Sequence, residues 1–149
     1  MRIGLGADHA GCALKVALSA HLASQGHEVV DYGTFDPDVS VDYPDFARAV
    51  SLAVASGSVD LGVLVCGTGI GMSIAANKVP GIRAALVHDV TTARLARLHN
   101  GANVVCMGAR LLAPALAIEC LDWFLAESFE VRHQRRLDKI AAIEKDSAS

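Results

Sequence analysis

A cysteine at the start of a glycine-rich loop is the residue of this chain best placed to do chemistry. Cys66 ends an apolar run typical of a buried strand, and Gly67, Gly69 and Gly71 follow at alternating positions. Glycine lets consecutive backbone N–H groups turn toward one point, and the start of the next helix adds unpaired donors. The pattern therefore predicts an anion site with a thiol at its rim. A thiolate there could move a proton while the backbone holds the negative charge that develops.

Two common glycine motifs do not fit this loop. Counted from Gly67, a dinucleotide-binding Gly-x-Gly-x-x-Gly would need glycine where the chain has Met72, and no Gly-Lys-Ser/Thr of a P-loop follows. A plain strand-to-helix turn is the alternative to an anion site, although three alternating glycines exceed what a turn requires. Cys66 itself fits either a packed apolar side chain or a thiolate favoured by a helix N-terminus.

Polar residues at other predicted strand and helix ends are further candidates. Asp8 and His9 follow the first predicted strand, where Asp8 either caps a helix or joins His9 at the mouth of a site. His99 and Asn100 end a predicted helix, which fits a C-terminal cap as well as a functional pair.

A short basic cluster lies near the end of this acidic chain. Arg132 and Arg136 are four residues apart, so they share one face of a helix, with His133 and Arg135 beside them. Such a cluster is usually a solvated face, but two guanidinium groups also match the oxygens of a phosphate. Arg110, just beyond the last predicted strand, could join them.

Composition and charge exclude several classes of protein. The 149 residues suit one domain, and a net charge of −3 gives no electrostatic case for nucleic acid. No apolar run reaches membrane-spanning length, and Met1–Leu5 enters a strand without signal-peptide organisation. The four cysteines form no Cys-x-x-Cys pair, and no His, Asp or Glu grouping has metal-ligand spacing. We therefore expect no metal and a reducing, cytoplasmic setting.

Apolar strands and helical patterns alternate along the chain. The expected strands are Arg2–Ala7, His27–Tyr32, Val59–Val65, Ile82–Val87 and Asn103–Met107. The expected helices are Cys12–Ser24, Pro44–Ser56, Met72–Lys78, Thr91–Leu98 and Pro114–Glu127, followed by a charged helical tail over Val131–Glu144 and a frayed end over Lys145–Ser149.

This order predicts an α/β fold. We expect a doubly wound, Rossmann-like parallel sheet of five strands, in a single domain over residues 1–149 whose C-terminal tail begins near residue 130. Ligands bind such sheets beyond the carboxyl ends of the strands. Asp8, Cys66 and Arg110 each follow a predicted strand, so we expect them at the same edge of the sheet.

Seven segments of the chain together resemble a known family. They are Gly6–Gly11, Asp42–Pro44, Cys66–Ser73, Ala75–Lys78, Gly81–Ala84, His99–Asn100 and Arg132–Arg136. In this order they resemble the ribose-5-phosphate isomerase B family, within the sugar-phosphate isomerases that also include galactose-6-phosphate isomerase subunits. The resemblance extends from Met1 to about Glu144.

The resemblance implies an aldose–ketose isomerisation of a phosphorylated sugar without metal or cofactor. It implies that Cys66 is the base that moves the proton between C1 and C2, since Met72 stands where relatives lacking this cysteine have a glutamate. It gives Asp8 the relay of protons between the two substrate oxygens. It gives His99 and Thr68 the opening of the furanose ring.

The resemblance also implies a set of binding residues and a second subunit. The backbone N–H groups that hold the cis-enediolate oxygen belong to Gly67, Gly69, Ile70 and Gly71. The side chains that hold the phosphate are His9, Arg110, Arg132 and Arg136, and those that position hydroxyl groups are Tyr43 and Asn100. In this family a second subunit completes the pocket, so a homodimer is implied, or a tetramer of paired dimers, with the tail from residue 130 reaching the partner.

The identity of the sugar stays open at this point. The loop Phe35–Val41 and the segment His88–Val90 are predicted to line the sugar pocket, and both look variable. Ribose 5-phosphate is the first expectation, with allose 6-phosphate, galactose 6-phosphate or a tetrulose phosphate as alternatives. A catalytically silent sugar-phosphate-binding subunit is a third hypothesis, which the combination of Cys66, Asp8 and His99 argues against.

Overall fold

The computed structural model describes residues 1–148 and contains one sheet of five parallel strands. They are β1 (Arg2–Ala7), β2 (Glu28–Asp31), β3 (Leu61–Cys66), β4 (Ala84–Leu86) and β5 (Val104–Gly108). Their order across the sheet is β2-β1-β3-β5-β4, and all neighbouring pairs run parallel. The order switches between β1 and β3, which is where doubly wound sheets bind ligands. The predicted α/β fold is confirmed.

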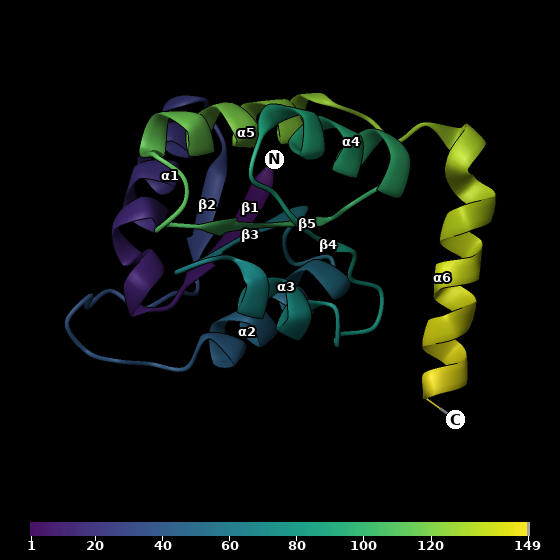
Figure 1. Ribbon diagram of the computed structural model, residues 1–149, viewed down its shortest axis with the longest axis horizontal. Coiled ribbons are helices and arrows are strands. Elements are labelled where there is room, and N and C mark those ends of the chain that lie inside the picture. Colours follow the sequence, from purple (N-terminus) through teal and green to yellow (C-terminus); the bar gives the residue numbers. More distant parts are fainter. Residues whose placement is uncertain (149) are drawn as a thin grey trace.

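Helices cover both faces of the sheet. One face carries α1 (Cys12–Ser24), α4 (Val90–Asn100) and α5 (Pro114–Ala126), and the other carries α2 (Tyr43–Ala55) and α3 (Ile70–Ala76), as Figure 1 shows. The central strands β3 and β5 are buried along their whole length, as their apolar sequences require. Among the described residues, no helix combines the length and hydropathy needed to cross a bilayer.

The predicted elements are confirmed with shifted ends. The change that matters for the site is at α3, which begins at Ile70 rather than Met72 because Gly69, at φ 78°, turns the chain directly into the helix. The tail contains a short 3-10 helix, η2 (Val131–His133), and then α6 (Gln134–Ser147). The frayed end predicted from Lys145 is therefore wrong as far as Ser147, and Ser149 lies outside the described residues.

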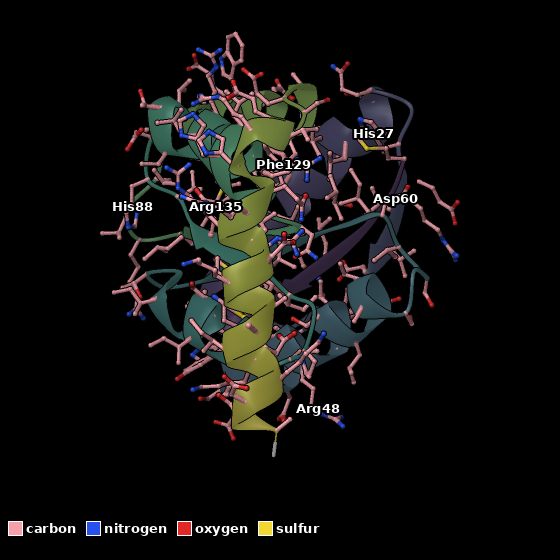
Figure 2. The ribbon with its side chains drawn as sticks, turned by 90° about the vertical axis from the view of Figure 1, so that its right-hand side faces the viewer. His27, Arg48, Asp60, His88, Phe129 and Arg135 are labelled. Atoms are coloured by element: carbon pink, nitrogen blue, oxygen red, sulfur yellow. The ribbon has the colours of Figure 1, made fainter. Side chains whose placement is uncertain are left out.

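The C-terminal helix α6 stands apart from both layers. It is the yellow helix at the right of Figure 1, and it crosses the face of the molecule that Figure 2 presents. None of its residues is buried, and Ile140 and Ile143 are 47% and 66% exposed. A hydrogen bond from the Gly81 N–H to Glu144 Oε1, 2.9 Å long, ties it to the loop before β4. Its apolar side chains therefore lack the cover that the other helices have.

A close backbone approach fixes the start of the site. The 3-10 helix η1 (His9–Gly11) follows β1, and a Cβ on Gly11 would lie 2.4 Å from the carbonyl oxygen of Val65 in β3. The Gly11 N–H donates to Asp8 Oδ1 at 3.1 Å, so Asp8 caps η1, which is one of the two roles that the sequence allowed. Asp8 is thereby held beside the end of β3.

We expect Gly11→Ala to lower the free energy of unfolding by about 1–3 kcal/mol, the range for overpacking a filled site. Gly4→Ala is the matched control, because a Cβ there would meet side-chain atoms, the nearest being Val59 Cγ2 at 3.2 Å. Urea unfolding of both variants makes the comparison. Equal losses would show that the approach of η1 to β3 imposes no special constraint.

Candidate active site

A cleft opens at the carboxyl ends of β1, β3 and β5. Its volume is about 370 Å³, and its lining residues are Asp8, Tyr43, Cys66, Gly67, Thr68, Ile70, Gly71, Ile74 and Arg110. Asp8 follows β1 and Cys66 ends β3, so both flank the point where the strand order switches. The sequence predicted all of these lining residues except Ile74, which faces the cleft from α3 and carries no polar group. The structure therefore brings Asp8, Cys66 and Arg110 together at one cleft, as the sequence predicted.

The glycine loop folds back onto the thiol. The Gly69 N–H donates to Cys66 Sγ at 3.1 Å, and the Ile70 N–H donates to Thr68 Oγ1 at 3.3 Å. Cys66 is 5% exposed, so its sulfur lies at the floor of the cleft beneath the start of α3. Two of the four backbone donors predicted for a substrate oxygen thus engage the loop's own side chains in this structure.

The glycines of the loop make room for their neighbours. A Cβ on Gly71 would lie 2.6 Å from Cζ of the Tyr43 ring, and one on Gly67 would lie 3.1 Å from a terminal nitrogen of Arg110. Gly108, at the end of β5, would clash with the backbone of Thr68 at 2.6 Å if it carried a Cβ. The ring, the guanidinium group and β5 can therefore all lie against the loop backbone.

His9 lies next to Asp8 and fastens a loop to this edge. Its Nδ1 accepts the Val41 N–H at 3.2 Å, and the ring is half-buried. With Nδ1 accepting, a neutral imidazole carries its proton on Nε2. The free end of the ring is therefore a hydrogen-bond donor, as a phosphate ligand requires.

The remaining predicted residues gather at the opposite edge of the sheet. His99 and Asn100 end α4, and after Gly101 the chain enters the amino end of β5 at Val104. The rings of His99 and His133 are 4.5 Å apart between centroids, which joins the end of α4 to η2. Within one chain, then, the structure does not bring His99, Asn100, Arg132 and Arg136 to Cys66.

Positive charge dominates this second group, which consists of His99, Glu130, Arg132, His133 and Arg136. Arg132 Nε donates to Glu130 Oε2 at 2.6 Å, and this bond is the main cause that lowers the pKa of Glu130. Arg136 donates to His133 Nδ1 at 2.9 Å. Burial lowers the pKa of His133, and the charges of Arg132, His99 and Arg136 lower it further. His133 was not among the predicted site residues, because nothing in a basic run indicates that one member is buried.

The second group suits an anion better than a metal ion. The ligand atoms of His99, Glu130 and His133 all lie within 4.8 Å of one another. Arginine can only donate, so the bond from Arg136 leaves His133 Nδ1 as the acceptor and puts the proton on Nε2. This nitrogen is buried without a hydrogen bond, 3.6 Å from Glu130 Oε2. A metal would need a lone pair there, and it would face two guanidinium groups.

Comparisons with known proteins identify the family of this chain. Residues 3–140 match the Ribose/Galactose Isomerase family. The chain is 46% identical over 144 residues to ribose-5-phosphate isomerase B of Escherichia coli strain K12, covering 96% of each sequence.

Solved structures extend the likeness to three dimensions. Ribose-5-phosphate isomerase B of Clostridium thermocellum is similar at a TM-score of 0.96 with 47% identity, covering 99% of both chains. The structure of the Mycoplasma genitalium ribose-5-phosphate isomerase B with bound ribulose-5-phosphate is similar at a TM-score of 0.93 with 46% identity, covering 97% of this chain and 96% of that one.

The electrostatics of the second group predict how His133 titrates. We expect its pKa to lie below the ordinary value of 6.5, and Arg132→Ala to raise it because a nearby positive charge is lost. Arg135→Ala is the matched control, since Arg135 does not act on this ring. Imidazole proton resonances followed against pH give the three values, and an unchanged His133 pKa in Arg132→Ala would contradict the arrangement.

The same shift has a consequence for stability. The folded-state pKa lies below the unfolded value, so the unfolded segment binds the proton more readily. The contribution of His133 to stability is present above pH of about 6.5 and is lost as the pH falls below it.

Proposed function

Because the chain belongs to the ribose/galactose isomerase family, we propose that it interconverts ribose 5-phosphate and ribulose 5-phosphate as an aldose–ketose isomerase. The observation that carries the proposal is the thiol of Cys66 at the floor of the cleft, under a backbone N–H donor and close to the carboxyl group of Asp8. The bound ribulose-5-phosphate of the Mycoplasma genitalium relative supports this choice of sugar. No cofactor enters the reaction.

The chemistry moves one hydrogen without any external oxidant or reductant. In the open-chain aldose, the Cys66 thiolate removes the proton from C2, and the electrons of that bond form the C1–C2 double bond of a cis-enediolate. The charge that develops on O1 is held by N–H groups of the loop from Gly67 to Gly71. The thiol then returns its proton to C1, and Asp8 passes the proton of O2 to O1, which yields the ketose and regenerates the thiolate.

We propose that two chains build each pocket. The two groups of site residues lie at opposite edges of the sheet, and strands of five or six residues separate these edges by roughly 17–20 Å. One chain supplies Cys66, Asp8 and Thr68, and its partner supplies His99 for ring opening with Arg132 and Arg136 for the phosphate. The exposed apolar side of α6 supports such a homodimer.

The residues that bind the sugar phosphate are divided between the two chains in the same way. His9 and Arg110 hold the phosphate from the first chain, Tyr43 positions a hydroxyl group there, and Asn100 of the partner positions another. The setting is a reducing cytoplasm, in keeping with four free cysteines among the described residues. A tetramer would pair two such dimers through other surfaces.

A galactose 6-phosphate substrate is the second candidate, because the matching family includes galactose isomerases as well as ribose isomerases. A coupled assay of the purified protein across ribose 5-phosphate, allose 6-phosphate, galactose 6-phosphate and a tetrose phosphate separates the two. Turnover highest with ribose 5-phosphate supports the proposal. No turnover with any of them would favour a silent binding subunit.

Cys66→Ala should lower turnover by at least about 10²-fold while substrate affinity changes only a few-fold, because the variant lacks the general base. Cys120→Ala is the matched control, since that thiol is fully buried in α5 away from the cleft. Steady-state kinetics and direct titration with ribose 5-phosphate supply the two readouts. Retention of more than a tenth of the wild-type turnover would remove Cys66 from the role of base.

Mixed dimers test the shared pocket. A Cys66→Ala chain and an Arg132→Ala/Arg136→Ala chain should each be inactive as homodimers, and their heterodimer should recover up to about half of the wild-type activity, because one pocket then holds both base and clamp. The matched control pairs a wild-type chain with a chain carrying all three substitutions. That heterodimer should be inactive, since each of its pockets has one defect. The reverse pattern of recovery would mean that each chain builds its own pocket.

A further inference from the structure

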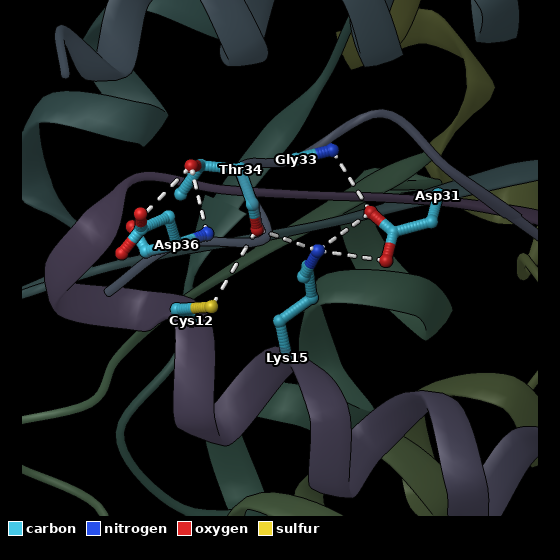
Figure 3. A network of polar contacts seen from close by, with 6 residues as sticks. All are labelled: Cys12, Lys15, Asp31, Gly33, Thr34 and Asp36. Carbon is cyan, nitrogen blue, oxygen red and sulfur yellow. Dashed lines mark hydrogen bonds and ion pairs between the residues drawn. The ribbon is translucent and has the colours of Figure 1, made fainter. Parts of the chain in front are cut away.

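A lysine ammonium group is fully buried outside the lining of the cleft. Lys15 lies on α1 and is 0% exposed. Its Nζ donates to both carboxylate oxygens of Asp31, at 2.8 and 2.7 Å, and to the carbonyl oxygen of Thr34 at 2.9 Å (Figure 3). These bonds use all three donors that an ammonium group has. None of the reaction steps above requires this charge.

The ammonium group organises the start of the loop between β2 and α2. The Phe35 ring centroid lies 4.2 Å from Lys15 Nζ, although Phe35 is 77% exposed. Asp31 Oδ1 also accepts the Gly33 N–H at 2.9 Å, and Cys12 Sγ contacts the Thr34 carbonyl at 3.5 Å (Figure 3). An exposed aromatic side chain is thereby held against the molecule by a buried cation.

This loop reaches the cleft at its other end. Val41 donates to His9 Nδ1, and Tyr43 begins α2 with its ring against Gly71. Among the described residues, 35–40 make no hydrogen bond to chain outside the loop, so its course depends on its two fastened ends. The Lys15 contacts fix one end, and the His9 contact fixes the other.

An ion pair with a buried ammonium group adds little net stability, because the cost of desolvation offsets most of the attraction. Here Lys15 holds the Thr34 carbonyl oxygen and the Phe35 ring, which lie near the start of the loop between β2 and α2. We propose that Lys15 is a positioning residue for the sugar-phosphate site. Through Thr34 and Phe35 it sets the loop over residues 33–42, and so sets the placement of Tyr43 and of the His9 ring. This inference rests on the proposed isomerase function and extends it to a residue outside the cleft.

The test removes the two charges together. In Lys15→Met/Asp31→Asn, methionine fills the lysine volume, and the asparagine carbonyl keeps the bond to the Gly33 N–H without leaving a lone buried charge. We expect KM for ribose 5-phosphate to rise roughly ten-fold with kcat within about three-fold, since binding contacts are displaced while Cys66 and its loop are not. A KM within two-fold of wild type, or a loss confined to kcat, would overturn the proposal.

Leu18→Ala is the matched control on the same helix. Leu18 is fully buried one turn from Lys15 and packs into the core, so its loss should lower thermal stability and leave KM unchanged. A KM rise in Leu18→Ala equal to that of the double variant would mean that loss of stability explains the effect. Phe35→Ala covers the case in which the double variant does not fold, because an exposed side chain tolerates truncation. It should raise KM two- to three-fold at unchanged stability, and no rise would count against the proposal.

Hydrogen exchange separates this inference from the proposed function. Protection of the Val41 amide, which bonds to His9, should fall at least ten-fold in the double variant and stay unchanged in Leu18→Ala. This readout holds even if the wild-type protein isomerises none of the sugar phosphates in the panel. Unchanged Val41 protection in a folded double variant would show that Lys15 does not set the loop.

Discussion

All five strands run in the same direction, and this constraint divides the polar side chains of the chain between two edges of the sheet. A parallel connection must carry the chain back across the sheet before the next strand begins, so each crossover helix starts at the carboxyl edge and ends at the amino edge. Cys66 follows a strand and lies at the first edge, whereas His99 ends a helix and lies at the second. Rearranging loops within one chain would not join them, and this is the physical reason why we propose a pocket built from two chains.

At the carboxyl edge, close backbone approach decides the geometry. The loop after Cys66 lies against the end of β5 because Gly108 has no side chain, and Gly69 supplies the left-handed turn that starts α3. The same turn aims the Gly69 N–H at the Cys66 sulfur. A side chain at either glycine would separate the thiol from the N–H donor that approaches it. The hydrogen bond to the Cys66 sulfur therefore depends on both positions having no side chain.

The charged cluster around Lys15 and the one around His133 are balanced differently. Around Lys15, a carboxylate, a carbonyl oxygen and an aromatic ring satisfy one ammonium group, so the cluster has no capacity left for a ligand. At the amino edge, two guanidinium groups and two imidazoles face the single carboxylate of Glu130. The first arrangement fixes the backbone, and the second leaves positive potential for an anion.

The sequence alone determined the parallel sheet and the glycine loop that begins at Cys66, because these depend on apolar periodicity and glycine spacing. It predicted one helix face for Arg132 and Arg136, but Arg132 lies in η2 and Arg136 lies in α6. It could not indicate that Lys15 is buried, since a lysine at this position in a helix pattern is ordinarily a surface residue. Nor could it give the start of α3 or the burial of His133. Those features depend on contacts between segments far apart in the chain: α1 with the loop after β2, the Cys66 loop with β5, and η2 with the end of α4. Only the tertiary structure decided them, because side-chain partners and close approaches exist only once the layers are packed.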